Sequence, residues 1–366
     1  MTFDLNRLVR PNVRNLRPYS SARSEFSCSA EIYLDANENS FGSPAGSALN
    51  RYPDPLQTEL KKKIAVLKKV AMDRIFVGNG SDEIIDLLIR IFCEPGRDQV
   101  IVCPPTYGMY AVCASLNDVR VASVPLDSDF HLRPAAVLAA AEPEAKMAFL
   151  CSPNNPTGNL MRRDSIVEIV ERFCGIVVVD EAYIDFSDAA SLIDGIDQLP
   201  NLVVVQTFSK AWGLAGARLG IAYASRGVIE LMNKIKPPYN VSSLNQSAAL
   251  GALRNEEEVK VWRTAIVRER FRLAEDLAAV AGIEAVYPSD ANFILVKAKD
   301  ARNLHLALID EGIVVRDRSD IERCGSCLRI TVGTPVENTR LIDAIKTAYA
   351  SLDLRSAATV RRGEAK

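Results

Sequence analysis

The chain has 366 residues, of which 48% are hydrophobic and 25% are charged, and its formal net charge is −2 at pH 7. This balance is typical of a globular protein with a large core, and the length favours about two domains. The near-zero net charge gives no reason to expect a nucleic-acid partner. The charged N-terminus lacks the apolar segment of a secretory signal, and no apolar stretch is long enough to cross a membrane. We therefore expect a cytoplasmic protein without membrane contact.

An N-terminal arm over residues 1–50 is rich in Asn, Arg, Ser and Pro, and we expect it to be mostly irregular. A larger domain is expected over 51–255, where short apolar runs alternate with amphipathic helical patterns such as 81–92 and 162–173. Strands that alternate with helices favour an α/β fold with a mainly parallel sheet flanked by helices. The expected strands of this sheet are 74–78, 99–105, 119–126, 146–153, 175–183, 201–210 and 218–224.

A smaller α+β domain is expected over 256–352. A long helical pattern with dense opposite charges opens it and ends at residue 282. Short strand-like runs follow, and helical patterns lie between and after them. The tail at 353–366 has little to bury and is expected to be disordered. The strand-like runs of this domain are 292–298, 313–317 and 327–333.

The eight cysteines stand in unrelated contexts, several of them inside strand-like runs such as "VIVCPP" and "AFLCSP". This pattern indicates buried, reduced thiols rather than a disulfide framework. Cys324 and Cys327 form a CxxC, but a zinc site would need two further ligands, and the only histidines are His131 and His305. We expect a turn before a strand at this CxxC, and no metal site.

Ligands of open α/β sheets bind at the carboxyl ends of the strands, so polar residues just after each apolar run are candidates. "VGNGSDE" places Gly80, Ser81 and Asp82 at a glycine turn that opens a helix, where free N–H groups bind phosphate. An ordinary helix N-cap has the same pattern. After the next apolar run, Tyr107 in "CPPTYGMY" either packs in the core or stacks on a planar ring.

Two further runs end in polar groups. Asn155, in "CSPNNPTGN", either shapes a tight turn or donates a hydrogen bond to a ligand. Asp180, in "IVVVDEAYIDF", ends an apolar run and should be buried, where a carboxylate requires a cation or hydrogen bonds. Tyr183 is close enough in the chain to share its site. A structural Asp paired with an Arg would leave the same pattern.

Lys210 and Arg218 stand in "TFSKAWGLAGARLG", a stretch that is otherwise small, apolar and glycine-rich. Lys and Arg are almost never buried without a partner, so both cations require one. Pyridoxal 5'-phosphate has a group that each of these strand-end residues could bind: a planar ring, a cationic ring nitrogen, a phenolic oxygen, a phosphate and a carbonyl. Lys210 would form the Schiff base and move the substrate proton, and Asp180 would keep the pyridine nitrogen protonated. Arg218 would bind the phosphate with Ser81 and Ser209.

These motifs resemble those of the fold-type I, pyridoxal-phosphate-dependent aminotransferases, class II, over nearly the whole chain. "SPNNPTG" and "SK…G.R.G" are shared widely among them, whereas "CPPTYGMY" together with "LRITVGT" is typical of the histidinol-phosphate branch. The resemblance implies transamination between L-histidinol phosphate and 2-oxoglutarate, giving imidazole acetol phosphate and L-glutamate in histidine biosynthesis. Aromatic amino acid aminotransferases and a phosphothreonine decarboxylase carry the same cofactor residues and remain alternatives.

The resemblance also implies roles for residues outside the strand ends. Tyr52, in "RYPDP", would reach the cofactor phosphate of a neighbouring subunit, so that a homodimer shares its active sites, with the arm contributing to dimer contacts and to the small domain. Arg329 and Arg316 would bind the carboxylate of glutamate and the phosphate of the amine substrate; strand-edge salt bridges are the alternative. Tyr107 would stack on the cofactor ring, and Tyr183 and Asn155 would hold the ring oxygen. Tyr19 and Tyr239 are expected to line the substrate pocket.

Overall fold

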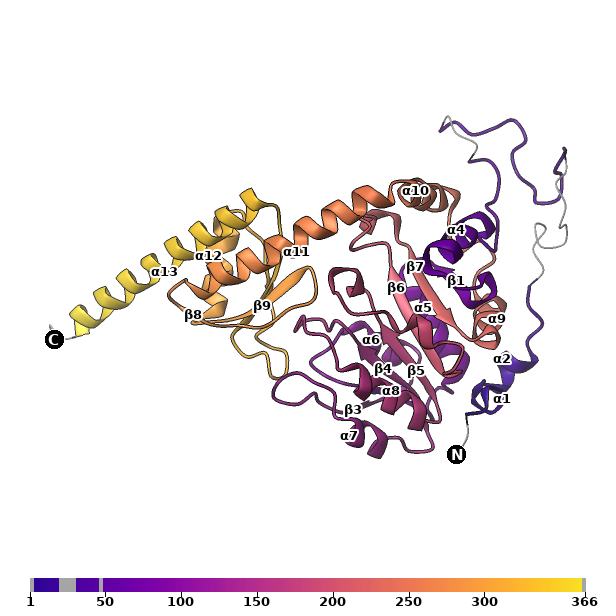
Figure 1. Ribbon diagram of the computed structural model, residues 1–366, viewed down its shortest axis with the longest axis horizontal. Coiled ribbons are helices and arrows are strands. Elements are labelled where there is room, and N and C mark those ends of the chain that lie inside the picture. The colour runs from indigo at the N-terminus through magenta and orange to yellow at the C-terminus, as the bar shows by residue number, and fades with distance from the viewer. Residues whose placement is uncertain (1–2, 20–30, 46–48, 364–366) are drawn as a thin grey trace.

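A computed structural model describes residues 3–19, 31–45 and 49–363 of the chain, with side chains up to residue 351 (Figure 1). Its central element is a seven-stranded sheet of order β1-β7-β6-β5-β4-β2-β3. The strands from β2 to β6 pair in parallel, whereas β7 runs antiparallel to both of its neighbours, β1 and β6. The expected mainly parallel, mixed sheet is therefore confirmed. The strands are β1 (Ile75–Gly78), β2 (Gln99–Val102), β3 (Arg120–Ser123), β4 (Ala145–Cys151), β5 (Ile176–Asp180), β6 (Leu202–Thr207) and β7 (Gly220–Ala224).

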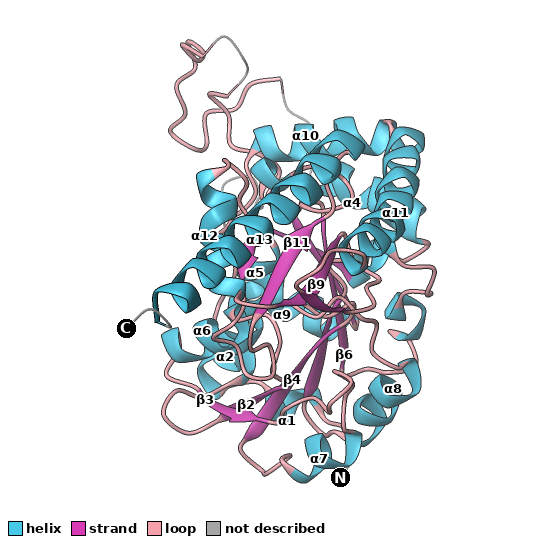
Figure 2. Ribbon diagram, turned by 90° about the vertical axis from the view of Figure 1, so that its left-hand side faces the viewer, coloured by secondary structure: helices cyan, strands magenta, loops and turns pink. Residues whose placement is uncertain are grey.

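Helices cover both faces of this sheet, and Figure 2 shows them on either side of the strands. Successive residues of a strand point to opposite faces, so an unbroken apolar run fills two cores. In β6, Val204 belongs to the core that contains residues of α4, α7, α8 and α10, whereas Val203 and Val205 belong to the core that contains residues of α5, α6 and α9. The seven-stranded sheet with these helices is called the large-sheet unit below. The helices are α4 (Thr58–Lys68), α5 (Ser81–Phe92), α6 (Met109–Leu116), α7 (Pro134–Ala139), α8 (Arg163–Arg172), α9 (Arg226–Ile235) and α10 (Ser243–Arg254).

A second, antiparallel sheet of order β10-β11-β9-β8 has its own apolar core against three helices; together they form the small-sheet unit. In Figure 1, α11 runs from the large-sheet unit to this one. The expected strand at 313–317 is shorter in the structure, and β8 was not expected at all. The elements are α11 (Glu256–Ala278), β8 (Ile283–Val286), β9 (Phe293–Ala298), α12 (Ala301–Asp310), β10 (Arg316–Asp317), β11 (Cys327–Thr331) and α13 (Pro335–Gly363).

The first part of the N-terminal arm differs from the expectation. It forms two short helices, α1 (Leu5–Leu8) and α2 (Pro11–Asn15), and it packs on the large-sheet unit. Val9 and Val13 are buried in the same core as α5 and α9, and the Arg10 N–H donates to the Ile91 carbonyl at 3.0 Å. The apolar side chains of these residues therefore pack with α5 and α9 of the large-sheet unit, and a contribution of the arm to the small domain stays a prediction.

The C-terminal helix continues into the segment 353–363, and the disorder expected for the tail stays a prediction. Helix α13 continues to Gly363 and extends away from the rest of the molecule (Figure 1). Its last three turns contain Leu, Arg and Ala, which have high helix propensity, and neither Pro nor Gly interrupts them before residue 363.

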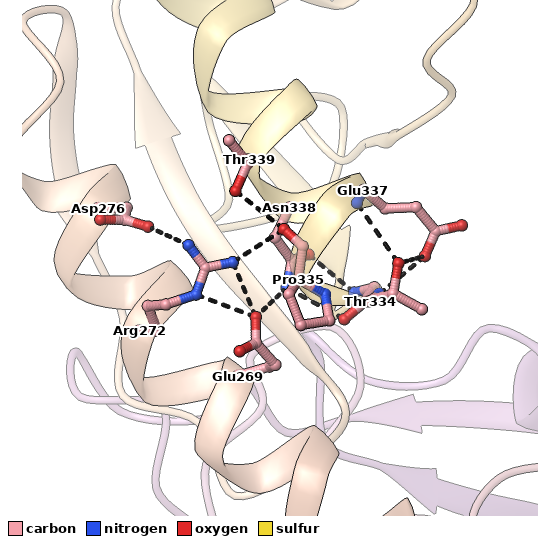
Figure 3. A network of polar contacts seen from close by, with 9 residues as sticks. Glu269, Arg272, Asp276, Thr334, Pro335, Glu337, Asn338 and Thr339 are labelled. Atoms are coloured by element: carbon pink, nitrogen blue, oxygen red, sulfur yellow. Dashed lines mark hydrogen bonds and ion pairs between the residues drawn. The ribbon is translucent and has the colours of Figure 1, made fainter.

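A buried polar network fixes the start of α13 against α11 (Figure 3). Asn338, 1% exposed, donates to Glu269 Oε2 at 3.1 Å and to the Gly333 carbonyl at 3.0 Å, and its Oδ1 accepts from the Gly333 N–H at 2.9 Å. Arg272 donates to the same Glu269 oxygen at 2.8 and 3.0 Å and to the Pro335 carbonyl at 3.1 Å. One amide therefore ties the loop after β11 to two helices.

We expect Asn338→Ala to lower the free energy of unfolding by about 1–3 kcal/mol, because it removes the partner of the half-buried Gly333 N–H and one buried hydrogen bond to the Glu269 carboxylate. Urea denaturation followed by circular dichroism measures the change. The control is Asn303→Ala, which removes an exposed hydrogen bond to Asp300 and should change stability by less than about 0.5 kcal/mol. Equal stability of the two variants would contradict the prediction.

Candidate active site

A cavity lies where the carboxyl ends of β4, β5 and β6 meet the amino ends of α5 and β7. Nine residues predicted from the sequence to bind a cofactor line it. Cys151 and Thr207, the last residues of β4 and β6, also line it and were not predicted, although their place at strand ends was a usable signal. The lining residues are Ser81, Asp82, Tyr107, Cys151, Asn155, Asp180, Ala182, Tyr183, Thr207, Ser209, Lys210 and Arg218.

One corner of the cavity is built for an anion. Gly80 has a φ of +84° and precedes α5, and a Cβ at Gly80 would lie 2.7 Å from Arg218 Nη2. A Cβ at Gly220, the first residue of β7, would lie 2.4 Å from the Ser81 nitrogen. The two glycines therefore let β7 and the amino end of α5 approach closely. This brings a guanidinium, free N–H groups and the hydroxyls of Ser81 and Ser209 to one place, as a phosphate requires.

Arg218 is held by neighbours from distant parts of the chain. Its Nη2 lies 3.3 Å from Asp82 Oδ2, and its Nη1 lies 3.5 Å from Ser209 Oγ. The backbone at Arg218 is left-handed, with a φ of +49°. The side chain is 47% exposed, so the segment is less buried than its apolar composition led us to expect. The partners that the Arg218 guanidinium requires are therefore the Asp82 carboxylate and the Ser209 hydroxyl, and its remaining side faces the cavity.

Asp180 ends β5 and is 4% exposed. Its Oδ2 accepts from the Tyr110 hydroxyl at 2.7 Å, and its Oδ1 accepts from the Ala182 N–H at 3.0 Å. Burial raises the pKa of the Asp180 carboxyl, while the Tyr110 and Ala182 hydrogen bonds act in the opposite direction. A buried carboxylate aimed into a cavity in this way fits a cationic ring nitrogen.

Tyr110 is a site residue that the sequence analysis missed. It is fully buried in α6, and its ring stacks on Phe149 of β4 with centroids 4.8 Å apart. The available signal was its position three residues after Tyr107, one helical turn further in "CPPTYGMY". Tyr107 itself meets the Tyr110 ring edge-on, and its hydroxyl donates to Asp82 Oδ1 at 3.0 Å.

Asn155 connects the two units at the cavity. Its Nδ2 lies 3.4 Å from the Tyr183 hydroxyl, and its Oδ1 accepts from Arg329 Nη1 at 2.5 Å. Arg329 lies in β11, and its guanidinium is 5.2 Å from the ring centroid of Phe293. The predicted arginine of the small-sheet unit therefore reaches the predicted asparagine of the large-sheet unit.

Lys210 projects toward Tyr183, with Nζ 5.5 Å from the ring centroid. Partial burial, together with the positive charges of Arg329 and Arg218, lowers the pKa of the Lys210 ammonium. A lysine with a lowered pKa is more readily neutral, which is the form that attacks a carbonyl. Lys210 is thus suited to covalent chemistry with an aldehyde.

Three predicted residues lie away from this cavity within their own chain. Tyr52 stacks on Tyr239 with ring centroids 4.4 Å apart, and both line a different hollow together with Arg51. Tyr52 is 50% exposed and Tyr19 is 78% exposed. Tyr19 and Tyr239 are thus not among the residues that line the cofactor cavity of their own chain, and their place in the substrate pocket stays a prediction.

A second cavity of about 390 Å³ adjoins the first and shares Tyr107 and Asn155 with it. It lies between the loop that follows β2 and the loop that follows β10. Most of its wall is apolar, including Pro104, Val121 and Ile321. A molecule held in the first cavity could extend into the second.

The expected turn before β11 is present. The Cys327 N–H donates to the Cys324 carbonyl at 3.0 Å, and both thiols are free. Among the residues that the structure describes, no group of three or more His, Cys, Asp or Glu could hold a metal ion. Over the same residues, none of the helices has the length and apolar character that a bilayer crossing requires.

Comparison with known proteins agrees with this geometry. The chain matches the family model "Aminotransferase class I and II" over residues 25–345. It is 51% identical to the histidinol-phosphate aminotransferase of Cytophaga hutchinsonii, covering 95% of this chain and 100% of that protein. It is 53% identical to that of Parabacteroides distasonis, covering 94% of this chain and 98% of that protein.

Among solved structures, the histidinol-phosphate aminotransferase of Sinorhizobium meliloti in complex with pyridoxal-5'-phosphate is 28% identical, with a TM-score of 0.77, covering 87% of this chain and 90% of that one. The family depends on this cofactor, and the donors of the cavity fit it. An amine with a lowered pKa, a buried carboxylate and an anion corner match its aldehyde, ring nitrogen and phosphate. The chain belongs to the class I and II aminotransferases, enzymes that use pyridoxal 5'-phosphate.

Proposed function

We propose that this enzyme is a histidinol-phosphate aminotransferase, which transfers the amino group of L-histidinol phosphate to 2-oxoglutarate. The products are imidazole acetol phosphate and L-glutamate. The observation that carries the proposal is the identity of 51% and 53% to two proteins of that name over more than nine tenths of the chain. Arg329, beside the cofactor cavity, supplies the cation that the carboxylate and phosphate substrates require.

Each cavity residue has a role in this proposal. The cofactor, when bound, supplies the electron sink that stabilises negative charge at the substrate Cα. Lys210 holds the cofactor covalently between turnovers and, once displaced and neutral, moves the proton from the substrate Cα. Asp180 holds the proton on the ring nitrogen. Tyr107 stacks on the ring, while Tyr183 and Asn155 donate to the ring oxygen.

The phosphate of the cofactor belongs, in this proposal, at the anion corner. Arg218 binds it, with the hydroxyls of Ser81 and Ser209 and the N–H groups at the start of α5 as further donors; the Gly80 N–H is not available, because it donates to the Gly78 carbonyl at 2.9 Å. Asp82, which holds both Arg218 and Tyr107, positions these two side chains rather than touching the phosphate. This assignment explains why an exposed arginine is fixed in a left-handed backbone conformation.

We also propose a homodimer with shared active sites and a cytoplasmic location. Tyr52 projects from its own large-sheet unit without reaching its own cavity, so it is free to reach the cofactor phosphate of a neighbouring subunit. Ile32, Leu34 and Phe41, on the same N-terminal segment, are exposed apolar side chains of the kind that a partner covers. Residues 51–255 and 256–352 are proposed to act as the large and small domains.

The visible absorbance of the bound cofactor tests the proposed substrate. Histidinol phosphate alone should convert the purified enzyme to the aminated form of the cofactor in one turnover, and 2-oxoglutarate should restore the original spectrum. A response to phenylalanine but not to histidinol phosphate would favour an aromatic aminotransferase. Release of carbon dioxide from phosphothreonine without a keto acid would favour a decarboxylase.

Tyr110→Phe should move the acidic limb of the pH–rate profile to higher pH. The change keeps the stacking on Phe149 and removes only the hydroxyl that donates to Asp180, a bond that stabilises the ionised carboxylate by about 1.5–3 kcal/mol. The pKa of Asp180, already raised by burial, should rise further, so that the carboxylate is lost at a higher pH as the solution is acidified. The measurement is kcat/KM against pH, with Tyr287→Phe as the control; an unmoved limb would contradict the assignment.

A further inference from the structure

The strands β10 and β11 place three arginines on one face of the small sheet. Arg316 pairs directly with Arg329 across the two antiparallel strands. Arg318 lies two residues after Arg316, and its N–H continues the pairing by donating to the Cys327 carbonyl at 2.9 Å. Directly paired residues share a face of a sheet, as do alternate residues along a strand. The neighbours of Arg329 in β11 are buried in the core on the other face, so this face points toward the large-sheet unit.

The charges of these arginines are not neutralised by the protein. Among the described residues, the side chains of Arg316, Arg318 and Arg329 make no ion pair with an acid, and the single hydrogen bond is that from Arg329 to Asn155. Arg318 Nε is buried without any hydrogen-bond partner. Burial, followed by the charges of Arg329 and Arg316, lowers the pKa of Arg318. A cluster of like charges with an unsatisfied donor calls for an anion.

The second cavity leads from the cofactor site to Arg318. Tyr107 and Asn155 line both cavities, and Arg318 lines the far side of the second. At about 390 Å³ the space has the size of a small-ligand pocket. Glu322 also lines it, but lies too far from Arg318 to form an ion pair. A substrate whose amine is at the cofactor can therefore place a distal anionic group beside the Arg318 guanidinium, on the sheet face that also carries Arg316 and Arg329.

We propose that Arg318 is a specificity-determining residue that binds the phosphate of the substrate together with Arg316 and Arg329. The inference rests on the proposed function and adds a residue to it. A carboxylate carries one charge and is matched by one guanidinium fork, which Arg329 provides. A phosphate monoester carries about −1.5 to −2 charges at pH 7 and three acceptor oxygens, so it benefits from the further cations. Arg318 thus favours the phosphorylated amine over glutamate.

The test compares Arg318→Gln, Arg318→Lys and the control Arg323→Gln, which removes an exposed arginine from the same loop. Single-turnover spectra of the cofactor-loaded enzyme give kcat and KM separately for histidinol phosphate and for glutamate. Calorimetric titration of the same cofactor-loaded proteins with inorganic phosphate gives a binding constant that does not depend on activity. Thermal unfolding and circular dichroism establish that each variant is folded.

For Arg318→Gln we expect a rise in KM for histidinol phosphate, with a loss in kcat/KM on the order of 10- to 100-fold, as for a lost charge-assisted hydrogen bond. The glutamate half-reaction should change by less than about 3-fold, because a rim charge that contacts no part of a substrate contributes little to its binding. Phosphate binding should weaken in parallel, Arg318→Lys should lie between wild type and Arg318→Gln, and Arg323→Gln should match wild type.

Equal losses for both amines, or unchanged phosphate binding, would overturn the inference and make Arg318 a structural residue. If the wild-type enzyme accepted glutamate but not histidinol phosphate, the proposed function would fall instead. Phosphate titration would still decide the role of Arg318 in that case. If Arg318→Gln did not fold, Arg318→Lys, which keeps the charge and loses the planar fork, would decide it.

Discussion

Replacement of Lys210 by alanine is expected to reduce turnover by roughly 10⁴-fold or more, because one side chain supplies both the nucleophile and the acid–base group. The remaining contacts of the cavity are untouched, since Arg218 is held by Asp82 and Ser209, and Asp180 by Tyr110. The variant should therefore still bind the cofactor, but without a covalent bond. Dialysis should remove the cofactor from Lys210→Ala and leave it on the wild type.

The measurement combines steady-state turnover with the absorbance spectrum before and after dialysis. Lys260→Ala, which removes an exposed lysine paired with Glu256 and Glu257, is the matched control and should behave as wild type. Substantial activity in Lys210→Ala would exclude the assigned role. Loss of all cofactor affinity would show that the covalent bond, and not the anion corner, provides most of the binding.

Asp180→Asn should lower kcat by about 10²-fold or more, as for the loss of an electrostatic group aimed at the reacting system. The amide keeps the size of the carboxylate but cannot hold a proton on the ring nitrogen. Asp194→Asn, a neutralisation on the surface, is the control. Unchanged kinetics in Asp180→Asn would assign Asp180 a purely structural role.

The same variant should not lose stability in the cofactor-free protein. Burial raises the pKa of Asp180 above its unfolded value of 3.8, so the folded state binds the proton more tightly and loses stability as the pH rises through the interval above 3.8. Above its folded-state pKa, the wild type carries a buried charge that Asp180→Asn removes. The melting temperature of the cofactor-free variant should equal or exceed that of wild type, and a lower one would contradict this reading.

The opposite effects of one substitution on activity and on stability would mark Asp180 as a residue kept for function. In the cofactor-loaded enzyme, the protonated ring nitrogen would be the cationic partner of Asp180, which the protein itself does not provide. Cofactor binding should therefore raise the melting temperature of wild type more than that of Asp180→Asn. Scanning calorimetry with and without cofactor measures this difference directly.

The strands of the large sheet were predictable from sequence because each is buried on both faces. A run such as 176–179 must then be apolar without interruption, and the polar residue that ends it, Asp180, marks the edge of the sheet where ligands bind. β8 (Ile283–Val286) had no such signal, because it is a short, half-buried edge strand in which Glu284 is exposed. Burial on both faces leaves a continuous apolar run, whereas burial on one face leaves an alternation that four residues are too few to establish.

Contacts between distant segments were beyond the reach of sequence patterns. The hydrogen bond between Tyr110 and Asp180 joins residues 70 positions apart, and nothing local in either segment requires it. The same holds for the packing of Tyr52 on Tyr239 and for the place of Arg318 beside the second cavity. The two short helices of the arm were not predictable for a related reason: Val9 and Val13 contact an apolar surface only in the folded protein.

The apolar pattern of β7 also did not predict that this strand runs antiparallel to its neighbours. This direction matters for cofactor binding. Because β7 runs against β1, its first residue, Gly220, pairs with the last residue of β1, Gly78. Arg218 thereby lies against Gly80 and Asp82, the latter 136 positions earlier in the chain. A shift of this pairing by one residue would take the guanidinium away from the anion corner. Binding of the cofactor phosphate at the anion corner therefore requires that β7 pairs with β1 in the correct register. A chain that is unfolded or paired in another register lacks this binding site.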